Sequence, residues 1–99
     1  MDKTRFLEIL QKNIELMEAK HGDYNSGNIK LEDYFPFGSL SYVQMLHVKQ
    51  LRLVSLLSSG AEQPNFESIA DTVRDMVNYA VFFLDHLEPA MKPKLVKKE

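Results

Sequence analysis

Side chains that can bind a cation or a polar ligand recur along one side of the helix that we predict for residues 65–87. At about 100° of rotation per residue, four of them fall within one arc of roughly 80°: Glu67, Asp71, Asp75 and Asn78. Carboxylates on successive turns of a helix can jointly hold Mg²⁺, a hard cation that takes oxygen ligands. The alternative is a solvated face, because a polar side opposite an apolar one is the usual design of an amphipathic helix. Spacing alone leaves both interpretations open.

A second group consists of two cations, Lys49 and Arg52, three residues apart on the helix that we predict for residues 39–58. That helix is apolar almost all round, and cations on a largely buried helix need partners. Inside the chain the candidates are the acids of the third helix, and outside it the candidate is a phosphate. His47 fits a buried, hydrogen-bonded histidine better than a metal ligand, since no two histidines have zinc spacing. The sequence contains no P-loop, GxGxxG or GxSxG motif.

The elements that must position these residues are helical. Apolar residues with a period of 3.6 predict an all-α fold with three main helices at about 3–20, 39–58 and 65–87. Ser39 and Asn65 are the expected N-caps, and Pro89 the expected stop. The core side of the third helix is predicted opposite its acids and comprises Ile69, Val73, Met76, Ala80, Leu84 and Leu87. Residues 1–87 are thus expected to form a single helical domain, followed by a flexible, lysine-rich tail at 88–99.

We also expect a homo-oligomer, a dimer or a multiple of dimers. The all-round apolar helix at 39–58 would be covered partly by a second subunit, which would complete the bundle. We call Glu67, Asp71, Asp75 and Asn78 the acid stripe. Phe82 lies on the same side of the third helix as the acid stripe and is expected to be exposed beside another chain.

The segment at 21–38 is a predicted loop, rich in turn-forming residues. A short helical turn is expected around residues 30–34. The segment carries aromatic residues that either plug a core, the commoner case, or stack on a planar ligand: Tyr24, Tyr34, Phe35 and Phe37.

Length and composition limit the remaining possibilities. The 99 residues fit one compact domain, and the net charge of −2 does not favour polyanion binding. The absence of cysteine excludes disulfides and thiolate chemistry. The polar, amphipathic N-terminal segment does not resemble a signal peptide, and no apolar run is long enough for a membrane span. We therefore expect a cytoplasmic protein with no membrane or nucleic-acid partner.

Three segments carry a resemblance to a known family: KHGDYNSGNI at 20–29, SYVQMLHVKQLRLVSLL at 41–57 and FESIADTVRDMVNYAVFFL at 66–84. Their order and spacing resemble a family of small phage and prophage proteins called nucleotide modification associated domain 1. The family looks like a relative of the MazG-type all-α nucleotide pyrophosphatases. The resemblance implies an oligomeric helical protein that binds phosphorylated nucleotides. The positions that it suggests for nucleotide binding are Lys20, Asp23, Tyr24, Lys49, Arg52, Asp71, Asp75 and Asn78.

In MazG-type enzymes, acids on two helices bind Mg²⁺, with an ExxE pattern on one helix and ExxD on the next. Here Glu67, Asp71 and Asp75 match the second set as candidate Mg²⁺ ligands, whereas the helix at 39–58 contains no carboxylate. Glu15 and Glu18 have the ExxE spacing but lie on a different helix. A hydrolytic site needs enough negative charge to fix the metal and activate its water.

Three hypotheses follow. The first is a phage-type protein that binds a phosphorylated nucleotide at a site near a subunit interface. It would sequester this nucleotide and would have no strong hydrolytic activity. The second is a Mg²⁺-dependent nucleotide pyrophosphatase whose metal site is completed by Glu15 or Glu18 of a neighbouring subunit. The third is a helical interaction protein in which the acids of the third helix and the cations Lys49 and Arg52 pair with each other or with a partner protein.

Overall fold

The computed structural model describes residues 1–21, 30–58 and 65–91 of the chain, with the side chains of residues 20 and 21 left out of that description. Its elements are the helix α1 (Lys3–His21), a 3₁₀ turn η1 (Leu31–Tyr34), and the helices α2 (Ser39–Leu57) and α3 (Phe66–Met91). The described residues contain no strand, which confirms the all-α prediction and its three main helices. The short turn expected around 30–34 is confirmed as η1. No helix among these residues combines the length and apolarity needed to cross a membrane.

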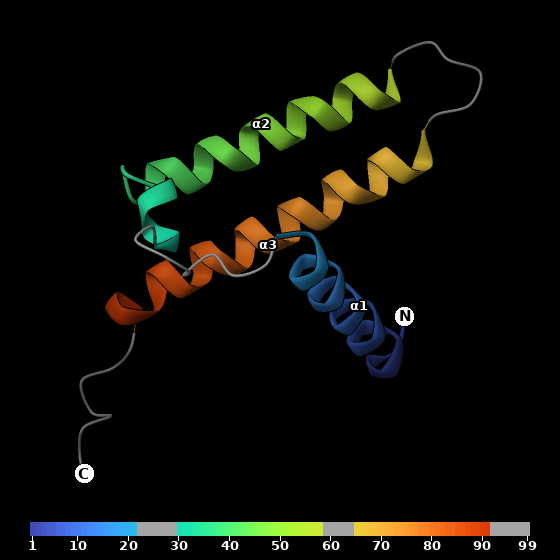
Figure 1. The fold of residues 1–99 in the computed structure, drawn as a ribbon, viewed down its shortest axis with the longest axis horizontal. Helices are drawn as coiled ribbons and strands as arrows, with labels where there is room; N and C mark the ends of the chain where they lie inside the picture. Colours follow the sequence, from blue (N-terminus) through green and yellow to red (C-terminus); the bar gives the residue numbers. More distant parts are fainter. Residues whose placement is uncertain (22–29, 59–64, 92–99) are drawn as a thin grey trace. The chain divides into compact units, whose positions relative to one another are not determined.

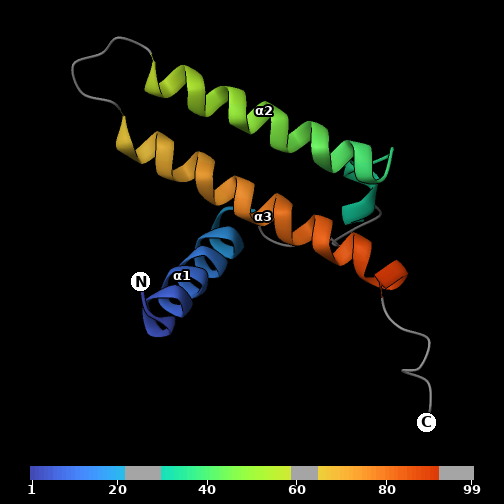
Figure 2. The ribbon, with the colours of Figure 1, turned by 180° about the vertical axis from the view of Figure 1, so that it is seen from behind.

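The helices α2 and α3 lie side by side and run in opposite directions (Figures 1 and 2). Together with the preceding turn they form one compact unit, Phe35–Glu99, and residues Met1–Tyr34 form another. In the N-terminal unit, α1 is an amphipathic helix in which Asn13 is the least exposed of residues 3–19. Several members of its apolar side are exposed: Phe6, Leu7, Ile9 and Ile14. The prediction that residues 1–87 form a single domain stays a prediction.

A tight turn at Phe35–Gly38 leads into α2. The Gly38 amide donates to the Phe35 carbonyl at 3.2 Å, with Pro36 in the position that favours its fixed φ. Gly38 has a φ of +61°, in the left-handed region where a side chain is strained. Its carbonyl accepts the Ser41 amide at 2.9 Å, so Gly38 is the N-cap of α2. The prediction of Ser39 as N-cap was wrong because Ser39 is already helical, and the Phe37 amide is satisfied by the Ser41 hydroxyl at 2.8 Å.

The turn also places Phe35 in the core of this unit. Its ring stacks on Tyr42 of α2 at a centroid distance of 4.1 Å, and Tyr42 stacks in turn on Phe83 of α3 at 5.3 Å. Phe35 is 6% exposed and Tyr42 is 3% exposed. The edges of Tyr79 and Phe82 approach the Phe35 ring at 6.0 and 6.4 Å. Stacked and edge-on rings are the arrangements that the aromatic quadrupole favours, so this cluster fixes how the turn and the two helices meet.

The end of α3 differs from its prediction. The helix was expected to stop at Pro89, but it continues to Met91 with Pro89 inside it. Residues 88–91, which were assigned to the tail, are therefore helical. Proline removes one intrahelical hydrogen bond and crowds the preceding turn. Here only Ala90 and Met91 follow it within the helix, so little helix depends on the lost bond. Residues 92–99 of the predicted tail lie outside the described residues.

The side of α3 that meets α2 also differs from the predicted core side. A hydrogen bond, an ion pair and two ring contacts join it to α2 through Thr72, Asp75, Phe83 and His86. Four of the predicted core residues are partly buried: Ile69, Met76, Ala80 and Leu87. Val73 and Leu84, both predicted core residues, are instead exposed. The expectation of an exposed Phe82 was wrong as well, because its ring packs against Phe35 and Tyr79 of the same chain and is only partly exposed.

Candidate functional site

A row of polar residues lies between α2 and α3, beyond the aromatic cluster. We call Lys49 and Arg52 of α2 and Thr72 and Asp75 of α3 the polar row. The Lys49 ammonium lies 3.1 Å from the Asp75 carboxylate, and the two side chains are 21% and 28% exposed. The prediction that the cations of the middle helix find partners among the acids of the third is confirmed for Lys49. Because both groups have lost most of their water, their attraction is screened less than that of a surface pair.

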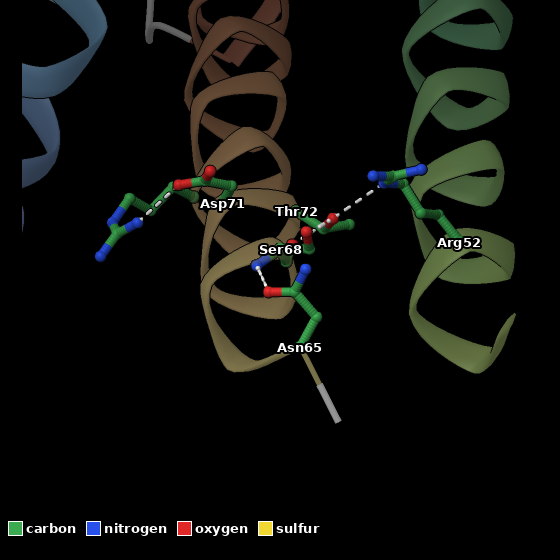
Figure 3. A network of polar contacts seen from close by, with 6 residues as sticks. Arg52, Asn65, Ser68, Asp71 and Thr72 are labelled. Carbon is green, nitrogen blue, oxygen red and sulfur yellow. Dashed lines mark hydrogen bonds and ion pairs between the residues drawn. The ribbon is translucent and has the colours of Figure 1, made fainter. Parts of the chain in front are cut away.

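Arg52 finds a neutral partner instead of an acid. Its Nε donates to the Thr72 hydroxyl at 3.2 Å, as Figure 3 shows. The Thr72 hydroxyl donates onward to the Ser68 carbonyl at 2.8 Å, and Thr72 is 2% exposed. Since this contact uses only Nε, the two terminal nitrogens of the guanidinium lie outside it, on a residue that is exposed overall. A planar guanidinium fork of this kind suits two oxygens of one phosphate.

The first turn of α3 supports the buried Thr72. The Ser68 amide donates to the Asn65 side-chain oxygen at 3.0 Å (Figure 3), which confirms Asn65 as the N-cap. The cap satisfies a backbone donor that has no partner within the helix. Glu67 lies in the same first turn, where the helix dipole favours an acid, and it is exposed.

The predicted acid stripe is divided between different partners. Asp71 points away from α2 in Figure 3 and pairs with Arg74 at 2.9 Å, whereas Asp75 pairs with Lys49. Within the described part of the chain, no three His, Asp or Glu side chains form a group that could hold a metal. A Mg²⁺ site at Glu67, Asp71 and Asp75 stays a prediction. In the present arrangement two of these carboxylates are neutralised by protein cations, so the donor set does not fit the open cluster of oxygens that Mg²⁺ needs.

The phenol of Tyr79 lies close to the polar row and is less acidic than a free tyrosine. Burial raises the pKa of its phenol above the ordinary value, and the nearby Asp75 carboxylate raises that pKa further. Both causes oppose a phenolate, the first by removing water and the second by repulsion. Tyr79 thus stays a neutral donor beside the polar row over the physiological pH range.

The other predicted binding residues lie outside the polar row or outside the described part of the chain. Asn78 lies on α3 and is half-buried. Lys20 belongs to α1, but its side chain lies outside the description, as do all of Asp23 and Tyr24. The predicted roles of Lys20, Asp23 and Tyr24 in nucleotide binding therefore stay predictions. Of the eight predicted nucleotide-binding residues, the structure brings Lys49, Arg52 and Asp75 together in the polar row.

Thr72 is the member of the polar row that the sequence interpretation missed. It lies between the acids and the apolar residues of α3, so neither pattern selected it. Its spacing to Asp75 and Tyr79 places all three on one side of the helix, three and seven residues apart. That spacing, continued by the aromatic Phe83 and His86, was the available signal for the side that meets α2.

Comparison with known proteins adds no assignment: no protein-family model, no curated protein and no solved structure matches the chain.

Proposed function

We propose that the chain binds a phosphorylated nucleotide through the polar row, with Arg52 and Lys49 contacting the phosphate. The observation that carries the proposal is the position of these two cations, one helical turn apart and both directed to the same side of α3. The resemblance to the nucleotide modification associated domain 1 family agrees with it. The helix that supplies the cations has no carboxylate, so the row as a whole is better suited to holding a phosphate than to cleaving one.

Charge supports the same assignment. The polar row contains two cations and one carboxylate, so it carries a net charge of +1 in a chain whose overall charge is −2. A phosphate brings more charge than Asp75 and can accept hydrogen bonds from both cations at once. Lys49 can exchange its carboxylate partner for the ligand, while Arg52 keeps its Thr72 contact and offers its terminal nitrogens.

Isothermal titration calorimetry against a panel of linear and cyclic nucleotides tests the proposal. We expect binding by the wild type and a loss of at least about tenfold in affinity for R52Q, since a charged hydrogen bond is worth about 1.5–3 kcal/mol. T72V tests the positioning of Arg52 separately, because it removes the hydrogen bond from Arg52 but keeps the guanidinium. An R52Q variant that binds as well as the wild type would overturn the assignment of Arg52. Absence of binding to every nucleotide at high micromolar concentration would overturn the function.

A second candidate function is that of a helical interaction protein without a ligand. The Lys49–Asp75 ion pair favours it, since pairing of these cations with acids of α3 is the arrangement that this hypothesis predicts. The extent of exposed apolar surface favours it as well. The calorimetric panel separates the two candidates, because only the first gives saturable heat with nucleotides that disappears in R52Q.

A further inference from the structure

The side of α2 that faces away from α3 carries a row of exposed aliphatic residues. Leu40, Val43, Leu51 and Val54 are 74%, 50%, 54% and 55% exposed. At about 100° per residue they share one arc of roughly 80° with His47, opposite Tyr42 and Lys49, which contact α3. We call Leu40, Val43, His47, Leu51 and Val54 the outer row. Four large aliphatic side chains in line along one helix make a continuous apolar strip, which is typical of an interface.

The outer row carries no Lys, Arg, Asp or Glu. The only such residues between Ser39 and Leu57 are Lys49 and Arg52, and both are turned toward α3. A partner with a strongly charged face would find no counter-charge here. A second copy of the same strip meets neither charge repulsion nor an unpaired buried charge, so the electrostatics favour self-association.

The order of residues in the outer row is symmetric about His47. Val43 and Leu51 lie four residues before and after it, and Leu40 and Val54 lie seven residues before and after it. Two exposed glutamines, Gln44 and Gln50, lie three residues before and after it. In a twofold interface residue i contacts residue j and j contacts i, so the contact surface must match its own reversed copy. The outer row meets this requirement for an antiparallel pair of helices.

We infer that the chain forms a twofold dimer in which two α2 helices pack antiparallel through the outer row, with the axis at His47. Val43 then contacts the partner's Leu51, Leu40 contacts the partner's Val54, and Gln44 faces the partner's Gln50. The packing removes four aliphatic side chains per chain from water. Among the described residues only Phe35 and Tyr42 are buried hydrophobics, so a further apolar interface supplies what the small core lacks. The inference does not rest on nucleotide binding, because the polar row lies on the other side of α2.

Charge-bearing variants test both the surface and its register. V43E places a carboxylate against the partner's Leu51, and L51K places an ammonium against the partner's Val43. Each variant alone is expected to weaken self-association at least about tenfold, since neither introduced charge has a counter-ion. Mixed in equal amounts, the two variants are expected to form a heterodimer, because the introduced charges then face each other. Sedimentation velocity measures the masses, circular dichroism checks helicity, and S55E is the control at an exposed position outside the outer row.

Cross-linking gives a second test that leaves the apolar contacts in place. The chain has no cysteine, so H47C introduces a single thiol at the proposed axis. It is expected to form a disulfide-linked dimer at least about tenfold faster than S55C under the same oxidant, because only groups near the axis meet their own copies. A monomeric wild type would overturn the inference. So would V43E with the wild-type mass, V43E and L51K that stay apart on mixing, or H47C that links no faster than S55C.

Discussion

The ion pair between Lys49 and Asp75 can be measured by a double-mutant cycle with K49M and D75N. Two unit charges 3.1 Å apart attract by about 5 kcal/mol at an effective dielectric constant of about 20. Lost hydration and side-chain ordering offset most of that attraction. The side chains are about one quarter exposed, which places the pair between exposed pairs, worth about 0.2–1 kcal/mol, and buried pairs, whose disruption costs about 3–5 kcal/mol. We therefore expect a coupling free energy of about 1–2 kcal/mol.

The two single variants should differ from the double variant in a defined way. D75N leaves the Lys49 ammonium without a counter-ion in a position with little water, and K49M does the same to the Asp75 carboxylate. Each is expected to lower the free energy of unfolding by about 2 kcal/mol, whereas the double variant loses less than the sum of the two. Urea unfolding followed by circular dichroism gives the free energies. Measurements at several protein concentrations separate folding from any contribution of self-association.

The same variants distinguish a structural pair from a ligand site. If phosphate replaces Asp75 as the partner of Lys49, D75N removes a competitor and should raise nucleotide affinity several-fold, while K49M lowers it. The reasoning about the pair fails if the single effects add up to the double effect within about 0.3 kcal/mol. The exchange of partners fails if D75N binds nucleotide no more tightly than the wild type.

Three further perturbations test the surrounding structure. Because the pKa of Tyr79 is raised from 10.0, its stabilising contribution is complete below pH 10 and declines as pH rises toward the higher folded-state value. Y79F should therefore lose less stability than the wild type between pH 9 and pH 11 in urea unfolding, and Y34F, at an exposed tyrosine, should behave as the wild type does. N65A removes the cap of α3 and should cost about 1 kcal/mol in the same assay. G38A forces a side chain into a left-handed conformation at φ +61° and should cost about 1–2 kcal/mol; an unchanged midpoint would show that the turn relaxes freely.

The three helices could be predicted from sequence because their apolar periods are long and their starts are marked by turn-forming residues. The cap at Asn65 was visible for the same reason, since its side chain acts on the backbone three residues away. The start of α2 at Ser39 was predicted correctly, but its cap was not, because Gly38 caps the helix through its backbone and not through a side chain. The end of α3 was missed since the penalty at Pro89 is small so close to the terminus.

The side of α3 that meets α2 could not be read from periodicity alone. Its apolar residues indicate one side, while Thr72, Asp75 and Phe83 indicate another, about a quarter turn away. The rings of Phe35 and Tyr42 contact α3, Phe35 at Tyr79 and Phe82 and Tyr42 at Phe83. These contacts join residues far apart in sequence, and no local propensity encodes them. The sequence indicated that Lys49 needs an acidic partner. Which acid it meets depends on how α2 is aligned against α3, and the aromatic contacts help to fix that alignment.

The structural and ligand-binding interpretations of the polar row do not exclude each other. The expected coupling free energy of the Lys49–Asp75 pair, about 1–2 kcal/mol, is comparable to the free energy of one charged hydrogen bond to a phosphate, about 1.5–3 kcal/mol. A ligand that contacts both Lys49 and Arg52 therefore gains more than the exchange of Asp75 costs. Without a ligand, Asp75 keeps Lys49 neutralised between the helices. Since α2 carries Lys49 and Arg52 on one side and the outer row on the other, the proposed ligand binding and the proposed self-association use different sides of the helix and can be tested independently.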